Sequence, residues 1–193
     1  ESENAGTDEV RTSVNYTLTA TAHVEKLSAI DAAATTALTL RGNEFAQEIT
    51  GNAGANTLDG KAGTDILAGL GGNDVYFVDS PADQIIEGAD EGTRDVLYSA
   101  VSYTLGANTA VEVLSTIQHA ATTAINLTGN ALRNELVGNA GANILAGGGS
   151  SNGRDTLIGL GGNDTYLVSQ GDEVIYESEN AGTDEVRTSV NYT

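Results

Sequence analysis

The chain of 193 residues has no cysteine, no methionine, no tryptophan and a single proline. The absence of cysteine excludes a disulfide framework and thiol catalysis. Basic residues are scarce as well, at 8 against 27 acidic residues, which gives a formal net charge of −19. That charge disfavours nucleic acid and acidic membrane surfaces as partners and favours cations. The sequence has no apolar run of about 18 residues, so we expect no membrane span.

Repetition at two lengths is the main feature that the chain does have. The first seventeen residues, ESENAGTDEVRTSVNYT, recur letter for letter as the last seventeen, 176 residues later. Within that period, GNAGAN at Gly51–Asn56 recurs at Gly138–Asn143, and GLGGND at Gly69–Asp74 recurs at Gly159–Asp164. Two similar halves of 86 to 90 residues therefore make one unit. We expect the chain to be a slice, slightly longer than one period, of a longer tandem array.

A nine-residue period lies inside each half. From Gly42 the rows read GNEFAQEIT, GNAGANTLD, GKAGTDILA and GLGGNDVYF, and from Gly129 they read GNALRNELV, GNAGANILA, an enlarged GGGSSNGRDTLI and GLGGNDTYL. A short strand with one inward side chain, followed by a glycine-rich turn, explains this pattern, so two rows make one coil of eighteen residues. The predicted inward residues are Ile49, Leu58, Leu67, Tyr76, Leu136, Leu145, Leu157 and Tyr166.

These rows closely resemble the hemolysin-type calcium-binding (RTX) nonapeptide, G-G-x-G-x-D-x-U-x. Gly60–Ala68, Gly69–Phe77 and Gly159–Leu167 fit it, except that Lys or Leu replaces the second glycine. The resemblance implies a parallel β-roll with Ca²⁺ between successive turns, usually in a protein exported by type I secretion. The predicted fold class is therefore all-β, a right-handed parallel β-roll or β-solenoid with two short strands per coil and two similar halves.

We predict one continuous solenoid along the chain. The apolar clusters of the linking segments recur every eight to eleven residues and are rich in Thr, Val, Tyr and Ile, which suits strands. A helix at Ala29–Ala37 is the competing interpretation of the first link. The predicted segments are linking coils at 1–41, a nonapeptide block at 42–83, linking coils at 84–128, a second block at 129–173, and the start of the next unit at 174–193.

Turns that lie eighteen residues apart stack on the same side, and this predicts calcium sites. Calcium takes about six to eight oxygen ligands from carboxylates and carbonyls. The spacing pairs Asp65 with Asp83, and it places Asp90 or Asp95 beside Asp74. In the second half it places Asp155 near Asp172 and Glu173, and Asp164 near Asn143. The expected ligands are Asp65, Asp74, Asp83, Asp155, Asp164 and Asp172, with Gly63, Gly72, Asn73, Gly162 and Asn163 from the turns.

Some turns have no carboxylate at the sixth position of the row. Gln47, Asn56, Asn134 and Asn143 stand there instead. We expect these turns to close by side-chain amide hydrogen bonds, so each unit should bind only a few calcium ions. The alternative is that Asp and Asn serve only as turn formers and that the acidity only keeps a secreted protein soluble.

No catalytic set emerges from the sequence, and we expect no enzyme. His23 and His119 occupy different places in the two halves and are expected at the surface. The favoured function is a calcium-stabilised structural repeat of an extracellular bacterial fibre, adhesin, or surface or matrix protein. Its expected partners are neighbouring copies of the same repeat and a cell-surface or matrix polysaccharide.

Two other functions stay open. The first is a folding and secretion module attached to a type I-secreted enzyme such as a protease, lipase or epimerase. The second is a carbohydrate-binding face on the solenoid, although no aromatic stripe is present.

Overall fold

A computed structural model of the chain describes residues 6–149 and 153–192. Those ranges contain nineteen strands and no helix. The chain forms two compact units, residues 1–96 and 97–193, and each contains one nonapeptide block. The strand β10 (Val96–Ser99) begins at the last residue of unit 1. The enlarged turn of the second block includes residues 150–152, which lie outside the described residues.

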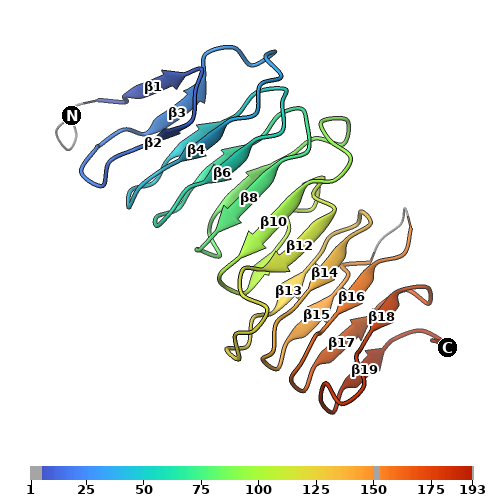
Figure 1. Cartoon of the computed structure of the whole chain (residues 1–193). Coiled ribbons are helices and arrows are strands. Elements are labelled where there is room, and N and C mark those ends of the chain that lie inside the picture. The colour runs from blue at the N-terminus through green and yellow to red at the C-terminus, as the bar shows by residue number, and fades with distance from the viewer. Residues whose placement is uncertain (1–5, 150–152, 193) are drawn as a thin grey trace. The chain divides into compact units, whose positions relative to one another are not determined.

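Unit 1 is a stack of coils with two short strands each (Figure 1). Odd-numbered and even-numbered strands lie in separate sheets, and neighbours within each sheet run parallel. In spatial order the odd sheet holds β1 (Glu9–Thr12), β3 (Lys26–Ala29), β5 (Glu48–Thr50), β7 (Ile66–Ala68) and β9 (Gln84–Ile86). The even sheet holds β2 (Tyr16–Thr17), β4 (Thr39–Arg41), β6 (Thr57–Asp59) and β8 (Val75–Val78).

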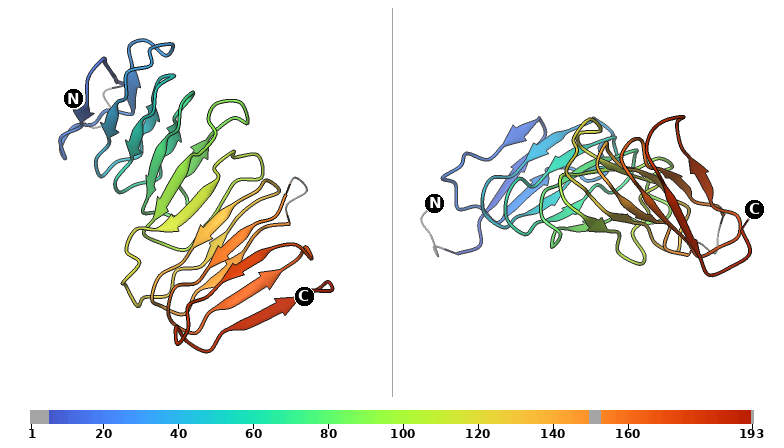
Figure 2. Two further views of the ribbon diagram at one scale, coloured as in Figure 1. Left: turned by 45° about the vertical axis from the view of Figure 1, so that its right-hand side comes forward. Right: turned by 90° about the horizontal axis from the view of Figure 1, so that it is seen from below.

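Unit 2 repeats this arrangement. Its short strands are again parallel and joined by turns at both ends, as the two views of Figure 2 show. One sheet holds β11 (Tyr103–Thr104), β13 (Leu127–Thr128), β15 (Ile144–Ala146), β17 (Thr165–Val168) and β19 (Glu185–Thr188). The other holds β12 (Val113–Thr116), β14 (Glu135–Val137), β16 (Thr156–Ile158) and β18 (Val174–Tyr176).

The core of each unit is a set of columns of apolar side chains. In the even sheet of unit 1, Leu40 is in register with Leu58, which is in register with Tyr76. Strands of one sheet place the same side chain of each coil on the same face, so such a column continues as coils are added. All eight predicted inward residues are 0% exposed, which confirms the nine-residue interpretation.

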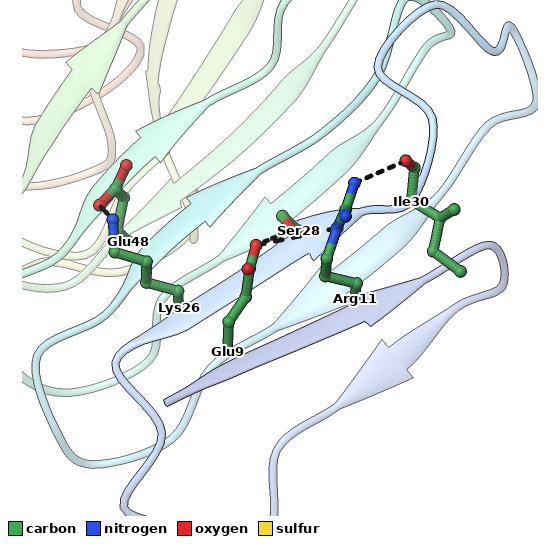
Figure 3. A network of polar contacts seen from close by, with 6 residues as sticks. All are labelled: Glu9, Arg11, Lys26, Ser28, Ile30 and Glu48. Atoms are coloured by element: carbon green, nitrogen blue, oxygen red, sulfur yellow. Dashed lines mark hydrogen bonds and ion pairs between the residues drawn. The ribbon is translucent and has the colours of Figure 1, made fainter. Parts of the chain in front are cut away.

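The outer face of the odd sheet in unit 1 carries a network of polar contacts (Figure 3). Lys26 Nζ lies 2.8 Å from Glu48 Oε2 on the next strand. The Ser28 hydroxyl donates to Glu9 Oε1 at 2.6 Å, and Arg11 donates to the Ile30 carbonyl at 2.8 Å. The basic side chains of β1 and β3 are therefore engaged on the outer face of the sheet.

The prediction of an all-β parallel roll with two strands per coil is confirmed, and the competing helix at Ala29–Ala37 is wrong. The Ala33 N–H donates to the Asp31 side chain at 3.0 Å, and the Ala34 N–H donates to the Asp31 carbonyl at 3.2 Å. This is a single turn. The Ala32 carbonyl instead accepts the Ala53 N–H of a later coil, at 2.8 Å. Pairing between coils therefore uses a backbone group that a helix would need.

The link strands within each unit confirm that linking segments form coils. The continuity of a single solenoid through both units stays a prediction.

Candidate metal centre

The sixth side chain of a nonapeptide row turns inward and is buried. Asp65 and Asp74 are both 0% exposed. One carboxylate oxygen of Asp65 accepts the N–H of Gln47, one coil earlier, at 2.7 Å, and Asp74 accepts the N–H of Asn56 in the same way at 2.6 Å. In unit 2, Asp155 and Asp164 repeat these bonds to Asn134 and Asn143, at 2.8 and 2.7 Å. The turns are thus stacked by a ladder of side-chain to backbone hydrogen bonds.

The ladder continues to the acid of the following coil. Asp65 donates its N–H to Asp83 at 3.0 Å, and Asp74 donates to Asp95 at 2.6 Å. The predicted Asp65–Asp83 pair is therefore present. Of the two candidates beside Asp74, the structure selects Asp95, which is buried, whereas Asp90 is exposed.

Turns with an amide at the sixth position close on themselves. The N–H of Asn52 donates to Asn56 Oδ1 at 2.7 Å, and Asn56 Nδ2 donates back to Asn52 Oδ1 at 2.9 Å. Asn52 also donates to the Thr36 carbonyl at 2.9 Å. The equivalent pairs Gln47 with Asn43 and Asn143 with Asn139 make the same bonds, and Asn134 accepts the Asn130 N–H. The predicted closure by amide hydrogen bonds is confirmed.

Turns with Asp at the sixth position are built differently. Their second residue, Lys61, Leu70 or Leu160, has a left-handed backbone with φ of 67°, 72° and 75°. The second carboxylate oxygens of Asp65, Asp74, Asp155 and Asp164 are buried and accept no hydrogen bond. A Cβ on the first glycine of these turns would overlap that oxygen, so glycine preserves its space. Each acid turn therefore presents an unsatisfied oxygen inside the stack.

At the end of the first block, three carboxylates meet. Asp74, Glu87 and Asp95 each offer an oxygen, and these oxygens lie within 4.8 Å of one another. All three residues are buried. The Tyr76 hydroxyl accepts the Gly69 N–H at 2.9 Å and donates to one oxygen of Glu87, whose other oxygen is buried without a partner.

A second cluster of the same kind ends the second block. Asp164, Glu177 and Asp184 offer oxygens within 4.8 Å of one another, and the Tyr166 hydroxyl donates to Glu177. Asp164 is 1% exposed, whereas the other two acids are exposed. The two clusters are half-unit copies, because Asp, Tyr and Glu are each displaced by 90 residues.

Two acid turns pair with single acids instead. Asp83 accepts the N–H groups of Asp79 and Ser80 at 3.3 and 3.1 Å. Glu173 has the corresponding place in unit 2 and accepts the N–H groups of Ser169 and Gln170 at 2.9 and 2.7 Å. Its other oxygen is buried without a partner. Glu173 is buried beside Asp155, whereas Asp172, whose charge also acts on Asp155, is exposed. The role of Asp172 as a ligand stays a prediction.

The predicted asparagines of the acid turns are exposed and brace the following link. The side-chain oxygen of Asn73 accepts the Thr93 N–H at 3.0 Å, and that of Asn163 accepts the Thr183 N–H at 2.9 Å. Their side chains are therefore engaged outside the acid clusters.

The predicted glycines of these turns lie where coils touch. Gly63, Gly72 and Gly162 have φ of 126°, 113° and 105°, and a Cβ on each would overlap backbone of the preceding coil. These glycines allow the close approach of turns on which the ladder depends.

Burial raises the pKa of Asp65 and Asp74 to about 7 and that of Glu87 to about 8. It raises the pKa of Asp155 and Asp164 to about 6. Backbone N–H bonds oppose this shift at the four aspartates, the Tyr76 hydroxyl opposes it at Glu87, and neighbouring carboxylates add to it. Burial also raises the pKa of the Tyr76 and Tyr166 hydroxyls above the ordinary value, so both stay protonated donors.

Several basic residues pair with other acids, although the charge of Arg133 acts on Asp155. Lys26, Arg41, Lys61 and Arg187 form ion pairs with Glu48, Asp59 or Glu185. Buried carboxylates are stable only when they are paired, protonated or bound to metal. A group of oxygen-only donors in a cramped turn suits Ca²⁺, which takes oxygen ligands in flexible geometry.

Glu87, Glu177 and Asp184 were missed from sequence, as were the tyrosine hydroxyls. A signal for the glutamates was present. Glu87 lies 18 residues after Gly69, at the first position of the next turn, and Glu177 has the same relation to Gly159.

Parallel coils with unsatisfied acids in their turns define a cation-binding β-roll. Residues 41–76, 128–166 and 150–175 match the RTX calcium-binding nonapeptide repeat (4 copies). The chain therefore carries RTX repeats, which bind Ca²⁺, and is a calcium-binding structural repeat module. No curated protein and no solved structure matches it. In the part of the chain that the structure describes, no helix has the length and hydrophobicity of a membrane span.

Proposed function

We propose that this module is the calcium-stabilised structural repeat of an extracellular bacterial fibre, adhesin, or surface or matrix protein. The observation that carries the proposal is the recurrence of seventeen identical residues at an offset of 176. Its natural partners would be further copies of the same repeat in the same chain, and a cell-surface or matrix polysaccharide is a candidate partner.

The two copies of the repeated segment supply complementary halves of one contact. The strand EVRT pairs as β1 with β3, with Val10 opposite Leu27. The same four residues pair as β19 with β17, with Val186 opposite Tyr166. A strand in a sheet has two edges. The first copy, β1, pairs through one edge with a strand that follows it in the chain, and the second copy, β19, pairs with a strand that precedes it. In a tandem array each EVRT strand would use both, so coils could be added without a break.

Calcium would control whether this stack forms. Without metal, the buried carboxylates must be protonated or repel one another, and neither condition favours folding at neutral pH. Calcium binding would remove the repulsion and couple folding to the metal concentration. A chain that stays unfolded at low intracellular calcium and folds outside the cell would suit export by type I secretion.

We also propose that the module is not catalytic. Ser115 Oγ lies 2.9 Å from His119 Nε2, but Ser115 is 3% exposed and lies within β12. His23 stacks on Phe45 with ring centroids 4.4 Å apart. These contacts are compatible with structural roles for both histidines.

Electron microscopy of a protein with several consecutive 176-residue repeats tests the proposal. The copy of β1 is β19, the eighteenth strand after it, so nine coils of about 4.8 Å should add about 40–50 Å per repeat at millimolar calcium. Compact globules that do not lengthen with repeat number would refute a rod. A catalytic domain encoded beside a single repeat would instead favour the secretion module of an enzyme.

A further inference from the structure

The acid cluster at the end of unit 2 is built from two copies of the repeat. Asp164 belongs to the nonapeptide block, whereas Glu177 and Asp184 lie in the recurring seventeen residues. The same two residues stand at positions 1 and 8, so in a tandem array the cluster brings together the block of one repeat and the opening residues of the next.

Four contacts hold the opening residues of the next repeat on the last acid turn. Asp164 donates its N–H to Asp184 at 2.9 Å, and Gly162 donates to the Ala181 carbonyl at 2.9 Å. Asn163 accepts the Thr183 N–H at 2.9 Å, and Tyr166 donates to Glu177. A Cβ on Gly182 would overlap the Gly162 carbonyl, so the two segments lie against each other.

These contacts leave one buried oxygen unsatisfied. Asp164 is 1% exposed, and its second carboxylate oxygen accepts no hydrogen bond. Asp164 lies in a cluster with two further carboxylates. Among residues 6–149 and 153–192, no basic side chain forms a hydrogen bond with Asp164. The arrangement holds the acids together by backbone and hydroxyl donors while leaving their charge uncompensated.

The corresponding place inside the repeat has the same construction. Gly72 donates to the Glu91 carbonyl at 2.6 Å, Asn73 accepts the Thr93 N–H, and Tyr76 donates to Glu87. There all three acids are buried. The repetition of the whole set after about 90 residues shows that the acids and their holding contacts belong to one device.

We propose that Asp164, Glu177 and Asp184 form a calcium site that joins each 176-residue repeat to the next. This inference rests on the tandem array proposed above. Calcium there ties the link at residues 177–184 to the turn beneath it and thereby fixes β19 in register on β17. Successive repeats are then joined by a metal-locked coil.

Hydrogen exchange on the 193-residue chain tests the joint, because the chain contains all three acids. In calcium, the amides of β19 should exchange at least about tenfold more slowly than in chelator. Glu177→Gln combined with Asp184→Asn should remove that difference at β19 while β15 stays protected. Glu179→Gln changes an exposed acid of the same link, and Asp8→Asn changes the sequence copy of Asp184, which is not in the cluster. Both controls should behave as the unchanged chain.

Terbium luminescence gives an independent measurement. Tb³⁺ replaces Ca²⁺ at oxygen sites and is excited through a nearby tyrosine, which Tyr166 supplies. Tyr76→Phe removes the equivalent tyrosine of the first cluster. In that background, the double substitution at Glu177 and Asp184 should weaken the terbium binding measured by tyrosine excitation by roughly tenfold or more.

The calcium site at Asp164, Glu177 and Asp184 would be refuted if the double variant and Glu179→Gln showed equal protection of the β19 amides from exchange, or equal terbium affinity. That outcome would leave the rod intact if tandem repeats still lengthen in micrographs. Conversely, a calcium-locked β19 in a protein whose repeats form globules would refute the rod and retain the site.

Discussion

Acidification should stabilise the chain when calcium is removed. Five buried carboxylates have a folded-state pKa well above the value of about 4 that they have in an unfolded chain. They are Asp65 and Asp74 at about 7, Glu87 at about 8, and Asp155 and Asp164 at about 6. Each binds its proton more tightly in the folded chain. The stability that depends on these protons is therefore present below about pH 4 and is lost as the pH rises through 6 to 8.

The size of the effect follows from the number of protons. At pH 6 the three groups with pKa of about 7 or 8 are protonated in the folded chain, and the two with pKa of about 6 are half protonated. All five are ionised in the unfolded chain at that pH. Folding therefore takes up about four protons, and the folding equilibrium constant should fall by about four powers of ten per pH unit near pH 6.

Urea unfolding in excess chelator, followed by circular dichroism between pH 5 and pH 8, measures this slope. Saturating calcium should reverse its sign, because the ion binds the deprotonated carboxylates. Asp74→Asn with Glu87→Gln removes two of the titrating groups and should reduce the proton uptake from about four to about two. Asp90→Asn changes an exposed acid of the same link and should leave the slope unchanged. A chelated chain whose stability is flat or rises between pH 5 and pH 8 would refute the reasoning.

Three further results are expected. Asp95→Asn should weaken calcium binding at the first cluster roughly tenfold in calorimetric titration, while Asp90→Asn should not. Leu70→Asn added to Asp74→Asn recreates the amide pair of the self-closing turns, so in chelator at pH 5 the double variant should be more stable than Asp74→Asn by about 1 kcal/mol in urea unfolding. Equal stability would contradict this account of the turns. Leu67→Ala should cost about 2–5 kcal/mol in urea unfolding at saturating calcium, because Leu67 is 0% exposed in β7, and a loss below 1 kcal/mol would contradict its place in the core.

The core of both blocks could be predicted because the same phase recurs in every row. Glycine at the first position and an apolar residue at the eighth repeat together, so a single misassigned residue could not shift the whole pattern. The distinction between acid and amide turns could be predicted for the same reason. Asn56 and Asp74 occupy the same position of the row and differ only in whether a side-chain N–H can close the turn.

The acids outside the blocks could not be placed by the same arithmetic, because the coils there have unequal lengths. Asp65 bonds to a residue 18 positions away, but Asp74 and Asp95 are 21 apart, and Asp164 and Asp184 are 20 apart. The spacing also could not separate Asp172 from Glu173, since both lie near Asp155. Asp172 is exposed in the turn before β18, whereas Glu173 is buried.

The order of turns within a block explains why the chain combines so much acid with so few ion-dependent positions. Each block begins with two amide turns, at Gln47 and Asn56 in unit 1, and ends with two acid turns. The amide turns satisfy their own polar groups and need no metal. The acid turns leave an oxygen unsatisfied, and the last of them receives its remaining acids from the link that follows the block. We therefore expect calcium where a block meets its link, and we expect the number of ions to rise with the number of blocks, not with the number of coils.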